Sequence, residues 1–389
     1  MPGDAENRLF EKRGWPQGRS GRAPAGFWTW GLTCHRCAGK GPATARAQSG
    51  SGMQGQDLKA PLAILRGAPP SAPAWFRQAL TIPPAHSVHR VEGAQIEALT
   101  WGERGRPGIL FLHGNAAHAD WWSFIAPLFA HDHRITAISW SGMGGSDWRE
   151  AYSADLFVAE AFEVAQATGL FAASMPPVFV GHSFGGLPTA ACAARRGQEL
   201  RAAIIVDSPF WPAARAKEQH ERIRQRRGQG PSPVYRSVAA ALARFRLLPA
   251  QPCDNLFIVD YIARRSLKEV GGGSGWTWRF DPYLWRRYRT SNPADDLAAA
   301  ACPIAMIRGT HSKVMTDEIA AFASSIAPAG SPLVEIPEAH HHVMIDQPLA
   351  FVAALRALLS GWVGGSGRSA SWCGDARRQR VATPQTTAL

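Results

Sequence analysis

The chain has 389 residues, 46% of them hydrophobic and 19% charged, which is enough for one large or two ordinary domains with a substantial core. No stretch approaches the roughly 18 consecutive apolar residues of a membrane span, and residues 1–30 lack the continuous apolar segment of a signal peptide. Most of the net charge of +12 lies at the two ends, since residues 1–74 carry +6 and residues 361–389 carry +3. The six cysteines are scattered, as is usual in a reducing compartment. We therefore expect a cytoplasmic protein with no membrane span and no nucleic-acid partner.

Composition also indicates how the chain is divided. Residues 1–74 are rich in Gly, Ala, Pro, Arg and Ser without a sustained period, so we expect a disordered or low-complexity extension, or sequence upstream of the true start. Residues 361–389 have the composition of a flexible tail. Between them we expect a core built from residues 75–207 and 301–360, with residues 208–300 inserted as a cap.

Strand-like and helix-like stretches alternate along this middle part, as a parallel sheet flanked by helices requires. The expected strands, in chain order, are residues 88–91, 97–101, 109–113, 134–140, 178–181, 203–207, 304–308 and 333–336. The expected helices are residues 121–130, 154–170, 184–196 and 349–360. The pattern predicts an α/β fold with a mostly parallel central sheet.

Residues 208–300 interrupt this alternation. Helical patches are expected at residues 213–227, 234–246 and 256–268, followed by a glycine-rich loop at residues 271–275. About ninety residues between two strands is too long for a loop in a compact domain. We therefore expect an inserted helical cap.

The sequence Gly181-His182-Ser183-Phe184-Gly185 has the pattern G-x-S-x-G, with an apolar strand before it and a helix after it. This order is that of a nucleophile elbow, in which a tight turn exposes a serine hydroxyl above the sheet. The two glycines leave room for the close approach of neighbouring backbone. Ser183 is the predicted nucleophile.

A serine needs a base to take its proton, and the base needs a carboxylate to orient it. The triplet His340-His341-His342 follows the last expected strand and precedes the closing helix, so a base is expected there. Upstream, a strand ends in His113-Gly114-Asn115. A backbone N–H of this segment, from Asn115, and the N–H of Phe184 would form an oxyanion hole.

These motifs resemble those of the α/β-hydrolase family, and most closely its capped esterases and meta-cleavage-type hydrolases. The resemblance covers about residues 85–360 and includes residues 139–147 and 341–348 as well as the elbow. It implies that His341 is the base, with His340 as the alternative. It also implies an acid after strand 304–308, but Ser312 and Lys313 stand there. Asp207, at the end of the preceding strand, is then the first choice of acid and Asp317 the second.

The resemblance implies that dehalogenases and epoxide hydrolases of this family carry an aspartate at the elbow. The serine at that position argues against both. It leaves a carboxylesterase acting on small to medium apolar or aromatic esters, a C–C bond hydrolase or a thioesterase. If no acid supports His341, a non-catalytic binding protein of the same fold is the remaining reading.

The expected partner is a small-molecule ester or related acyl substrate. Trp121, Trp122 and Trp211 are expected to line its pocket. No phosphate-binding loop, dinucleotide fingerprint or metal-ligand spacing occurs, so no cofactor or metal is expected. The sequence carries no sign of the oligomeric state.

Overall fold

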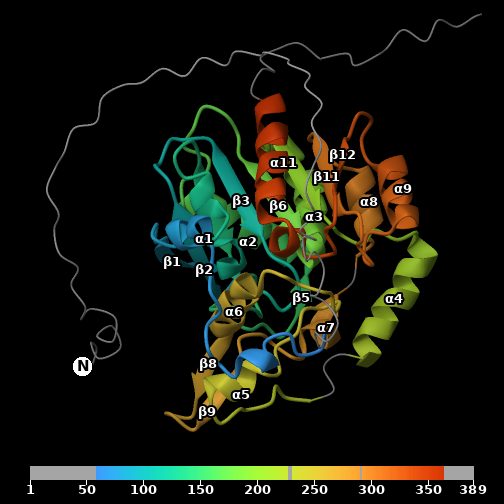
Figure 1. Ribbon diagram of the computed structural model, residues 1–389. Helices are drawn as coiled ribbons and strands as arrows, with labels where there is room; N and C mark the ends of the chain where they lie inside the picture. The colour runs from blue at the N-terminus through green and yellow to red at the C-terminus, as the bar shows by residue number, and fades with distance from the viewer. Residues whose placement is uncertain (1–57, 227–229, 290, 363–389) are drawn as a thin grey trace, which may run out of the picture. The chain divides into compact units, whose positions relative to one another are not determined.

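The structure is a computed structural model that describes residues 58–226, 230–289 and 291–362 (Figure 1). An eight-stranded sheet runs through it in the order β1-β2-β4-β3-β6-β7-β11-β12. These strands are β1 (Ala85–Val91), β2 (Ala94–Trp101), β3 (Gly108–Leu112), β4 (Arg134–Ile138), β6 (Val178–His182), β7 (Ala202–Val206), β11 (Ile304–Gly309) and β12 (Leu333–Ile336). β1 pairs antiparallel with β2, and β2 pairs antiparallel with β4. All other neighbouring strands in this order are parallel. The predicted fold class is confirmed.

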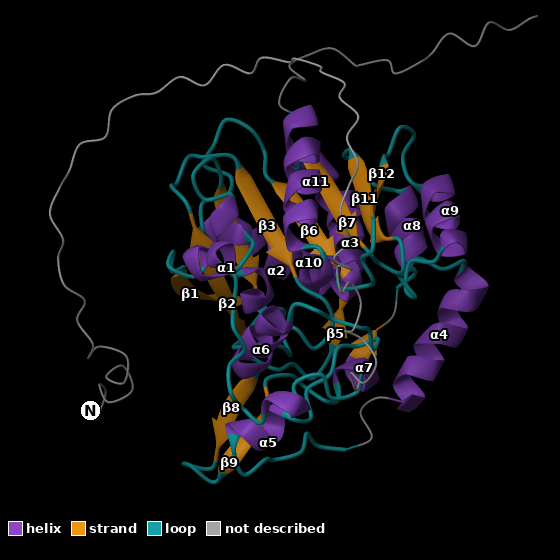
Figure 2. Ribbon diagram, viewed as in Figure 1, coloured by secondary structure: helices purple, strands orange, loops and turns teal. Residues whose placement is uncertain are grey.

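Both faces of this sheet are covered by helices, because alternate residues of each buried strand point to opposite faces. On β3, Ile109 and Phe111 belong to one apolar cluster, whereas Leu110 and Leu112 belong to the other. Figure 2 shows α11 lying across the front of the sheet. The first cluster includes side chains of α1 (Ala74–Ala79) and α11 (Pro348–Gly361); the second includes those of α2 (Ala154–Ala167), α3 (Gly186–Arg196), α8 (Pro293–Ala298) and α9 (Asp317–Ile326).

Strands and helices predicted outside the insertion agree with the structure to within a few residues, with one exception. Residues 121–130 were expected to form a helix, but they contain only the short 3₁₀ turns η2 (Ala119–Trp122) and η3 (Ala126–Leu128). Trp121, Trp122, Phe124 and Ile125 are all buried, so this segment has no exposed face. It packs as irregular chain in the core, and Pro127 lies in its second turn.

The insertion between β7 and β11, which we predicted to be a helical cap and continue to call the cap, contains a hairpin as well as helices. Its helices are α4 (Ala213–Arg226), α5 (Val238–Leu242), α6 (Leu256–Arg265) and α7 (Leu284–Arg287), followed by α8. The expected helix 256–268 ends early, because the chain turns at Ser266 into β8 (Leu267–Val270), which pairs antiparallel with β9 (Gly275–Trp278). The glycine run 271–275 is the hairpin turn, with positive φ at Gly271, Gly272 and Gly273. In Figure 1 this hairpin and α5 lie on the side of the cap away from the sheet.

The two predicted terminal segments fall mostly outside the described residues, which exclude 1–57 and 363–389. Within the predicted extension 1–74, however, Leu62 is 1% exposed and belongs to the first core cluster, next to the 3₁₀ turn η1 (Ala63–Leu65). The packed chain therefore begins before residue 75, because Leu62 supplies an apolar anchor. The domain boundaries themselves stay predictions. In the described part of the chain, no helix combines the length and apolar character needed to cross a membrane.

A buried carboxylate joins the cap to the sheet. Glu97 on β2 accepts hydrogen bonds from Ser139 Oγ (2.6 Å) and the Gly145 N–H (2.8 Å), and its other oxygen lies 3.0 Å from Nη2 of Arg279 in the cap. Burial by itself raises the pKa of Glu97, but Arg279, the Ser139 hydroxyl and the Gly145 N–H outweigh it, so the pKa is lowered. Glu97 is therefore a charged anchor for a cap residue.

A second junction lies at the short parallel pair of β5 (Tyr152–Ser153) and β10 (Tyr288–Arg289). Beside it, the Tyr152 hydroxyl donates to Asp281 Oδ2 of the cap at 2.8 Å, and Arg287 Nη1 lies 2.9 Å from the same oxygen. The cap is thus fixed to the core by backbone pairing and by two hydrogen-bonded charge clusters.

Removing the charge of Glu97 should weaken this attachment. We expect Glu97→Gln to lower the free energy of unfolding by about 1.5–3 kcal/mol, because it disrupts charge-assisted hydrogen bonds and leaves Arg279 without its anion. Because the pKa of Glu97 is lowered in the fold, its contribution is present above the ordinary glutamate pKa and is lost as pH falls through the lowered value. Urea denaturation of Glu97→Gln and the parent measures this effect. The difference between their free energies of unfolding should be smaller at acid pH than at neutral pH.

The matched control is Glu103→Gln, which removes the same charge from a side chain that is 79% exposed. Its free energy of unfolding should stay within about 0.5 kcal/mol of the parent. Equal effects of the two substitutions would show that the Glu97 cluster does not hold the cap.

Candidate active site

The turn after β6 holds Ser183 in a strained backbone conformation. Ser183 has φ +55°, at the first position of the 3₁₀ turn η4 (Ser183–Gly185), which leads directly into α3. A Cβ on Gly185 would lie 2.5 Å from the carbonyl oxygens of Leu112 and His113, and a Cβ on Gly181 would collide with Thr189 and Gly185. Both glycines of the motif are therefore required by close backbone contact. A left-handed non-glycine residue is the kind of strain found at functional sites.

Ser183 begins a chain of hydrogen bonds with two other predicted residues. His341 Nε2 lies 2.8 Å from Ser183 Oγ, and His341 Nδ1 lies 2.8 Å from Asp207 Oδ1. His341 lies in the loop between β12 and the short helix α10 (Val343–Asp346), and its side chain is 2% exposed. Three segments far apart in the sequence thus meet at the carboxyl ends of the parallel strands.

Asp207 follows β7 directly and is held by two further donors. The Gly309 N–H donates to Oδ2 at 2.9 Å and the Ser312 hydroxyl to Oδ1 at 2.5 Å. Asp207 itself has φ +48°, which aims its carboxylate at this loop. Ser312 stands where the resemblance leads one to expect the acid, and it donates a hydrogen bond to Asp207, the acid predicted at the end of the neighbouring strand. The carboxylate that is missing from the loop after β11 is therefore replaced by Asp207, which lies beside that loop.

The two alternative residues lie elsewhere. Asp317 is the first residue of α9, is 92% exposed and pairs with Arg308 Nη2 at 2.6 Å; the helix cap is Thr316. His340 is directed toward Asp346. Its main-chain nitrogen lies 2.7 Å and its ring Nδ1 3.2 Å from Oδ2 of that carboxylate. The structure therefore brings Asp207 and His341 to Ser183, and brings neither Asp317 nor His340.

The loop after β3 lies beside the serine. The N–H of Phe184 is at the start of η4, where a helix leaves its first donors without intrahelical acceptors. Asn115 lines the same cavity, and its side-chain oxygen accepts a hydrogen bond from Nε1 of the cap residue Trp285 at 2.8 Å. The next residue, Ala116, has φ +57° and donates its N–H to Met143 Sδ. The main-chain N–H groups of Asn115 and Phe184 thus stay predicted donors to an oxyanion.

His113 supports this loop without facing the cavity. Burial lowers its pKa to about 3, so the ring is neutral. Its Nδ1 lies 2.7 Å from the Gly114 carbonyl, and its Nε2 accepts the Trp140 N–H at 3.0 Å. The buried ring therefore links the segments that follow β3 and β4.

A cavity of about 540 Å³ opens above Ser183. It is lined by Trp121, Trp211 and Trp285 among other apolar side chains, and by Lys313 and Arg215 among polar ones. Its size falls in the range of small-molecule sites. Two of the three predicted pocket tryptophans, Trp121 and Trp211, are among the lining residues.

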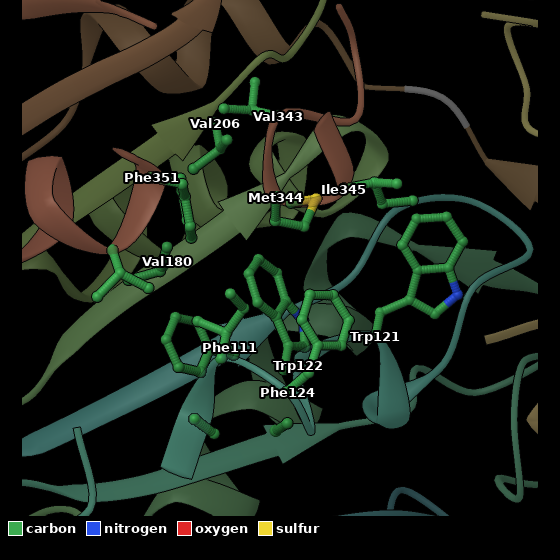
Figure 3. Packing of buried hydrophobic residues seen from close by; sticks show 14 of the residues in the cluster. Phe111, Trp121, Trp122, Phe124, Val180, Val206, Val343, Met344, Ile345 and Phe351 are labelled. Carbon is green, nitrogen blue, oxygen red and sulfur yellow. The ribbon is translucent and has the colours of Figure 1, made fainter. Parts of the chain in front are cut away.

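The third, Trp122, was wrongly expected to line the pocket. Its ring stacks on Phe111 at 4.5 Å and lies beside Phe351 of α11 in the core (Figure 3). Trp121 lies apart from that stack in the same figure. Because η2 is a tight turn, adjacent side chains leave it in different directions. One tryptophan therefore faces the cavity and its neighbour the sheet.

The sequence did not predict that two further histidines lie beside the predicted base. His182 precedes the nucleophile and His342 follows the base, and both line the cavity. Their rings lie 4.9 and 4.7 Å from that of His341. Burial, together with the His341 imidazole nearby, holds the pKa of each well below the ordinary value. The histidine triplet and the histidine inside the elbow motif were visible signals, but their convergence depends on the fold.

Comparison with known proteins identifies the family. A family model described as "Alpha/beta hydrolase family" matches residues 109–355. The chain belongs to the α/β-hydrolase family. Among curated proteins, Esterase Rv0045c of Mycobacterium tuberculosis is 25% identical over 254 residues, which is 61% of this chain and 77% of that protein. This α/β hydrolase is therefore similar to an esterase, and hydrolysis is its class of activity.

Solved structures agree with this fold. The crystal structure of the esterase Rv0045c from Mycobacterium tuberculosis matches with a TM-score of 0.54 and 25% identity, covering 79% of this chain and 100% of that one. A thioesterase domain from the curacin biosynthetic pathway matches with a TM-score of 0.57 and 24% identity, covering 71% of this chain and 99% of that one. The second likeness concerns the fold alone.

The different positions of the tryptophans can be tested by stability. We expect Trp122→Ala to lower the free energy of unfolding by about 3–5 kcal/mol, because it leaves a cavity against Phe111 and Phe351. Trp211→Ala should lower it by about 1 kcal/mol or less, since that side chain is only partly buried at the cavity wall. Denaturant unfolding of both variants measures the difference, and similar losses would contradict the two placements.

Proposed function

We propose that this hydrolase is a serine carboxylesterase acting on small to medium apolar or aromatic esters, with Ser183 as nucleophile, His341 as base and Asp207 as acid. The observation that carries the proposal is the pair of 2.8 Å hydrogen bonds that join Ser183 to His341, both in the wall of the cavity, and His341 to the buried Asp207. A hydroxyl, an imidazole and a buried carboxylate in this order are what nucleophilic acyl transfer needs.

In the proposed reaction, Ser183 Oγ attacks the ester carbonyl carbon while its proton passes to His341 Nε2. Asp207 keeps the Nδ1–H of His341 oriented and offsets the positive charge that forms on the ring. When the tetrahedral intermediate collapses, the alcohol leaves with the proton from Nε2 and an acyl-enzyme remains. Water then attacks the acyl carbon by the same route, and the carboxylic acid departs with Ser183 restored.

The negative oxygen of the intermediate would be stabilised by the N–H groups of Asn115 and Phe184. Donors fixed by the backbone need no reorganisation as charge develops, and one such donor is typically worth about 10²–10³-fold in rate. Because the donor on Asn115 is the main-chain N–H, the side chain is free for its bond to Trp285 of the cap. The cap and the oxyanion loop are therefore coupled.

Substrate size and polarity follow from the cavity lining. Ala117, Leu187, Ile223 and Val314 supply apolar surface in addition to the tryptophans. Each buried methylene of a substrate contributes about 0.8 kcal/mol. The similarity to an esterase supports an ester substrate. A C–C bond hydrolase and a thioesterase would use the same nucleophile, and they are separated from an esterase only by the substrate offered.

The acid assignment has a sharp test. We expect a fluorophosphonate probe to label Ser183, as mass spectrometry of the labelled peptide would show, and Ser183→Ala to abolish labelling. Asp207→Asn should slow hydrolysis of p-nitrophenyl butyrate by about 10³–10⁴-fold, because the base loses its tautomer and orientation.

Asp317→Asn provides the matched control, since it is the same substitution at the alternative acid, whose side chain is 92% exposed and pairs with Arg308. Its activity should stay within about twofold of the parent. Full activity of Asp207→Asn would refute the acid assignment. A properly folded parent that the probe does not label would instead support a non-catalytic binding protein.

Chain length of the ester tests the substrate class. We expect kcat/KM for p-nitrophenyl esters to rise about two- to fourfold per methylene from acetate to butyrate or hexanoate, and to level off once the acyl chain fills the cavity. Trp121→Ala enlarges the cavity and should move the maximum of kcat/KM to longer acyl chains. Trp148→Ala is the control, because Trp148 lies on the surface and is 44% exposed. Faster turnover of a thioester or a dienone than of any ester would replace the ester proposal by that alternative.

A further inference from the structure

A second cavity is formed mostly by cap residues, from the loop after α5 and from β9 and its neighbours (Figure 1). Its volume is about 630 Å³, compared with about 540 Å³ for the first cavity, the one above Ser183. Its wall includes four aromatic side chains and two arginines, namely Tyr235, Phe245, Trp278, Phe280, Arg244 and Arg246. We propose that this second cavity holds the alcohol part of the ester substrate, and that Arg244 and Arg246 bind an anionic group at the far end of that alcohol.

The second cavity adjoins the first through a smaller one of about 170 Å³. Asn115 and Trp285 line both the first cavity and the smaller one. Ala116 and Phe280 line both the smaller cavity and the second one. Leu248 borders all three and is 47% exposed, so its side chain stands between open spaces. The three cavities therefore lie in a row, and a long ligand can extend from the first to the second past Leu248.

The position of the ester bond determines which part of the substrate enters the second cavity. Asn115, whose N–H is a predicted oxyanion donor, lies where the first cavity meets the smaller one. In the proposed function the acyl chain fills the first cavity, so the alcohol, on the other side of the ester bond, is directed past Leu248. This step rests on the proposed function, whereas binding of an anion in the second cavity does not.

The charges around the second cavity favour an anion. Arg244 and Arg246 are exposed, and neither makes a hydrogen bond or ion pair with another described residue. No acidic side chain is among the described residues that line this cavity. The smaller cavity has Asp281 in its wall, but that carboxylate is paired with Arg287 at 2.9 Å. Because a guanidinium matches the geometry of a carboxylate or a phosphate, either group fits the two free arginines.

The aromatic side chains favour an apolar connection between the ester bond and the anion. The Trp278 ring lies 5.7 Å from that of Tyr235 and 5.9 Å from that of Phe245, so the three rings form one apolar surface in the wall. Each methylene that a ligand buries on such a surface contributes about 0.8 kcal/mol. An apolar wall with a few polar groups at one place is the usual form of a small-molecule site. The substrate class is therefore an ester of a short or medium acyl group with a long apolar alcohol that ends in an anion.

Hydrolysis of matched esters tests the charge. The probes are the butyrate esters of 8-hydroxyoctanoic acid and 8-hydroxyoctanamide, which have the same length and differ in terminal charge. We expect kcat/KM to be at least about threefold higher for the acid, because each exposed arginine contributes up to about fivefold. The preference should shrink in about 0.5 M NaCl, since salt screens exposed charges. The butyrate ester of 8-hydroxyoctyl phosphate shows which anion is preferred, and a preference for either anion over the amide supports the proposal.

The two arginines are tested by removing their charge. Arg244→Gln and Arg246→Gln should each reduce the preference for the acid, and the double variant should bring the ratio of the two kcat/KM values to about one. Arg236→Gln is the matched control, because Arg236 is an exposed arginine of the cap that does not line the second cavity. It should keep the preference of the parent.

Binding can be measured without catalysis. On the Ser183→Ala background, calorimetric titration should give a lower Kd for the ester of 8-hydroxyoctanoic acid than for that of 8-hydroxyoctanamide, by about threefold or more. The difference should disappear when Arg244→Gln and Arg246→Gln are combined on this background.

The path between the cavities is tested at Leu248. Leu248→Trp should lower kcat/KM for the 8-hydroxyoctanoic acid ester about tenfold relative to methyl butyrate on the same variant, because the larger ring obstructs the path. Leu248→Val, which keeps a small branched side chain, should not cause this relative loss. In the parent, the butyrate esters of 3-hydroxypropanoic acid and its amide should show no charge preference, since that alcohol is too short to reach past Leu248.

Four outcomes would overturn the inference. They are equal kcat/KM for the two eight-carbon esters, a preference that the double arginine variant retains, a preference as large for the three-carbon acid, or a larger charge preference in methyl esters of dicarboxylic acids. The last would place the acyl chain in the second cavity. If Ser183→Ala binds the charged ester more tightly as expected but the fluorophosphonate probe does not label Ser183, the anion site stands and the proposed function fails.

Discussion

The hydrogen bond between His341 and Asp207 connects parts of the sheet that do not pair with each other. Asp207 follows β7, whereas His341 follows β12, and β11 lies between these strands. The same carboxylate is held by Gly309 and Ser312 from the end of β11, so three strand ends are joined at one buried group. A carboxylate buried without such donors would be strongly destabilising. Its position fixes the His341 ring, and the ring in turn fixes the Ser183 hydroxyl. The proposed chemistry depends on this one contact.

Local signals were sufficient to predict the strand, turn and helix around Ser183, but not to choose between the residues that the fold could bring to it. The elbow is predictable because strand, turn and helix are continuous in sequence, and steric contacts at Gly181 and Gly185 require glycine there. The acid is a different problem, since Asp207 and Asp317 both follow or begin regular elements and only tertiary contacts distinguish them. The choice of Asp207 relied on the absence of a carboxylate at Ser312, and in space Ser312 donates to that same Asp207. Ser312, which stands where a carboxylate was expected, is therefore a hydrogen-bond donor to the proposed acid.

Features that sequence reasoning missed involve side chains whose partners are distant in the chain. Trp121 and Trp122 are adjacent, and periodicity cannot tell which faces the cavity when the segment forms a 3₁₀ turn instead of a helix. Glu97 sits on a strand as an ordinary charged residue until the fold brings Ser139, Gly145 and Arg279 around it. The β8-β9 hairpin was hidden by a helical pattern that continued past Ser266. In each case the outcome depended on tertiary packing and not on the local sequence alone.

The cap contacts the loop after β3 and the edge of the sheet, which links the position of the cap to the chemistry proposed for the site. Trp285 and Arg279 of the cap reach Asn115 and Glu97 of the core, so a change in cap position would be transmitted to the donors beside Ser183.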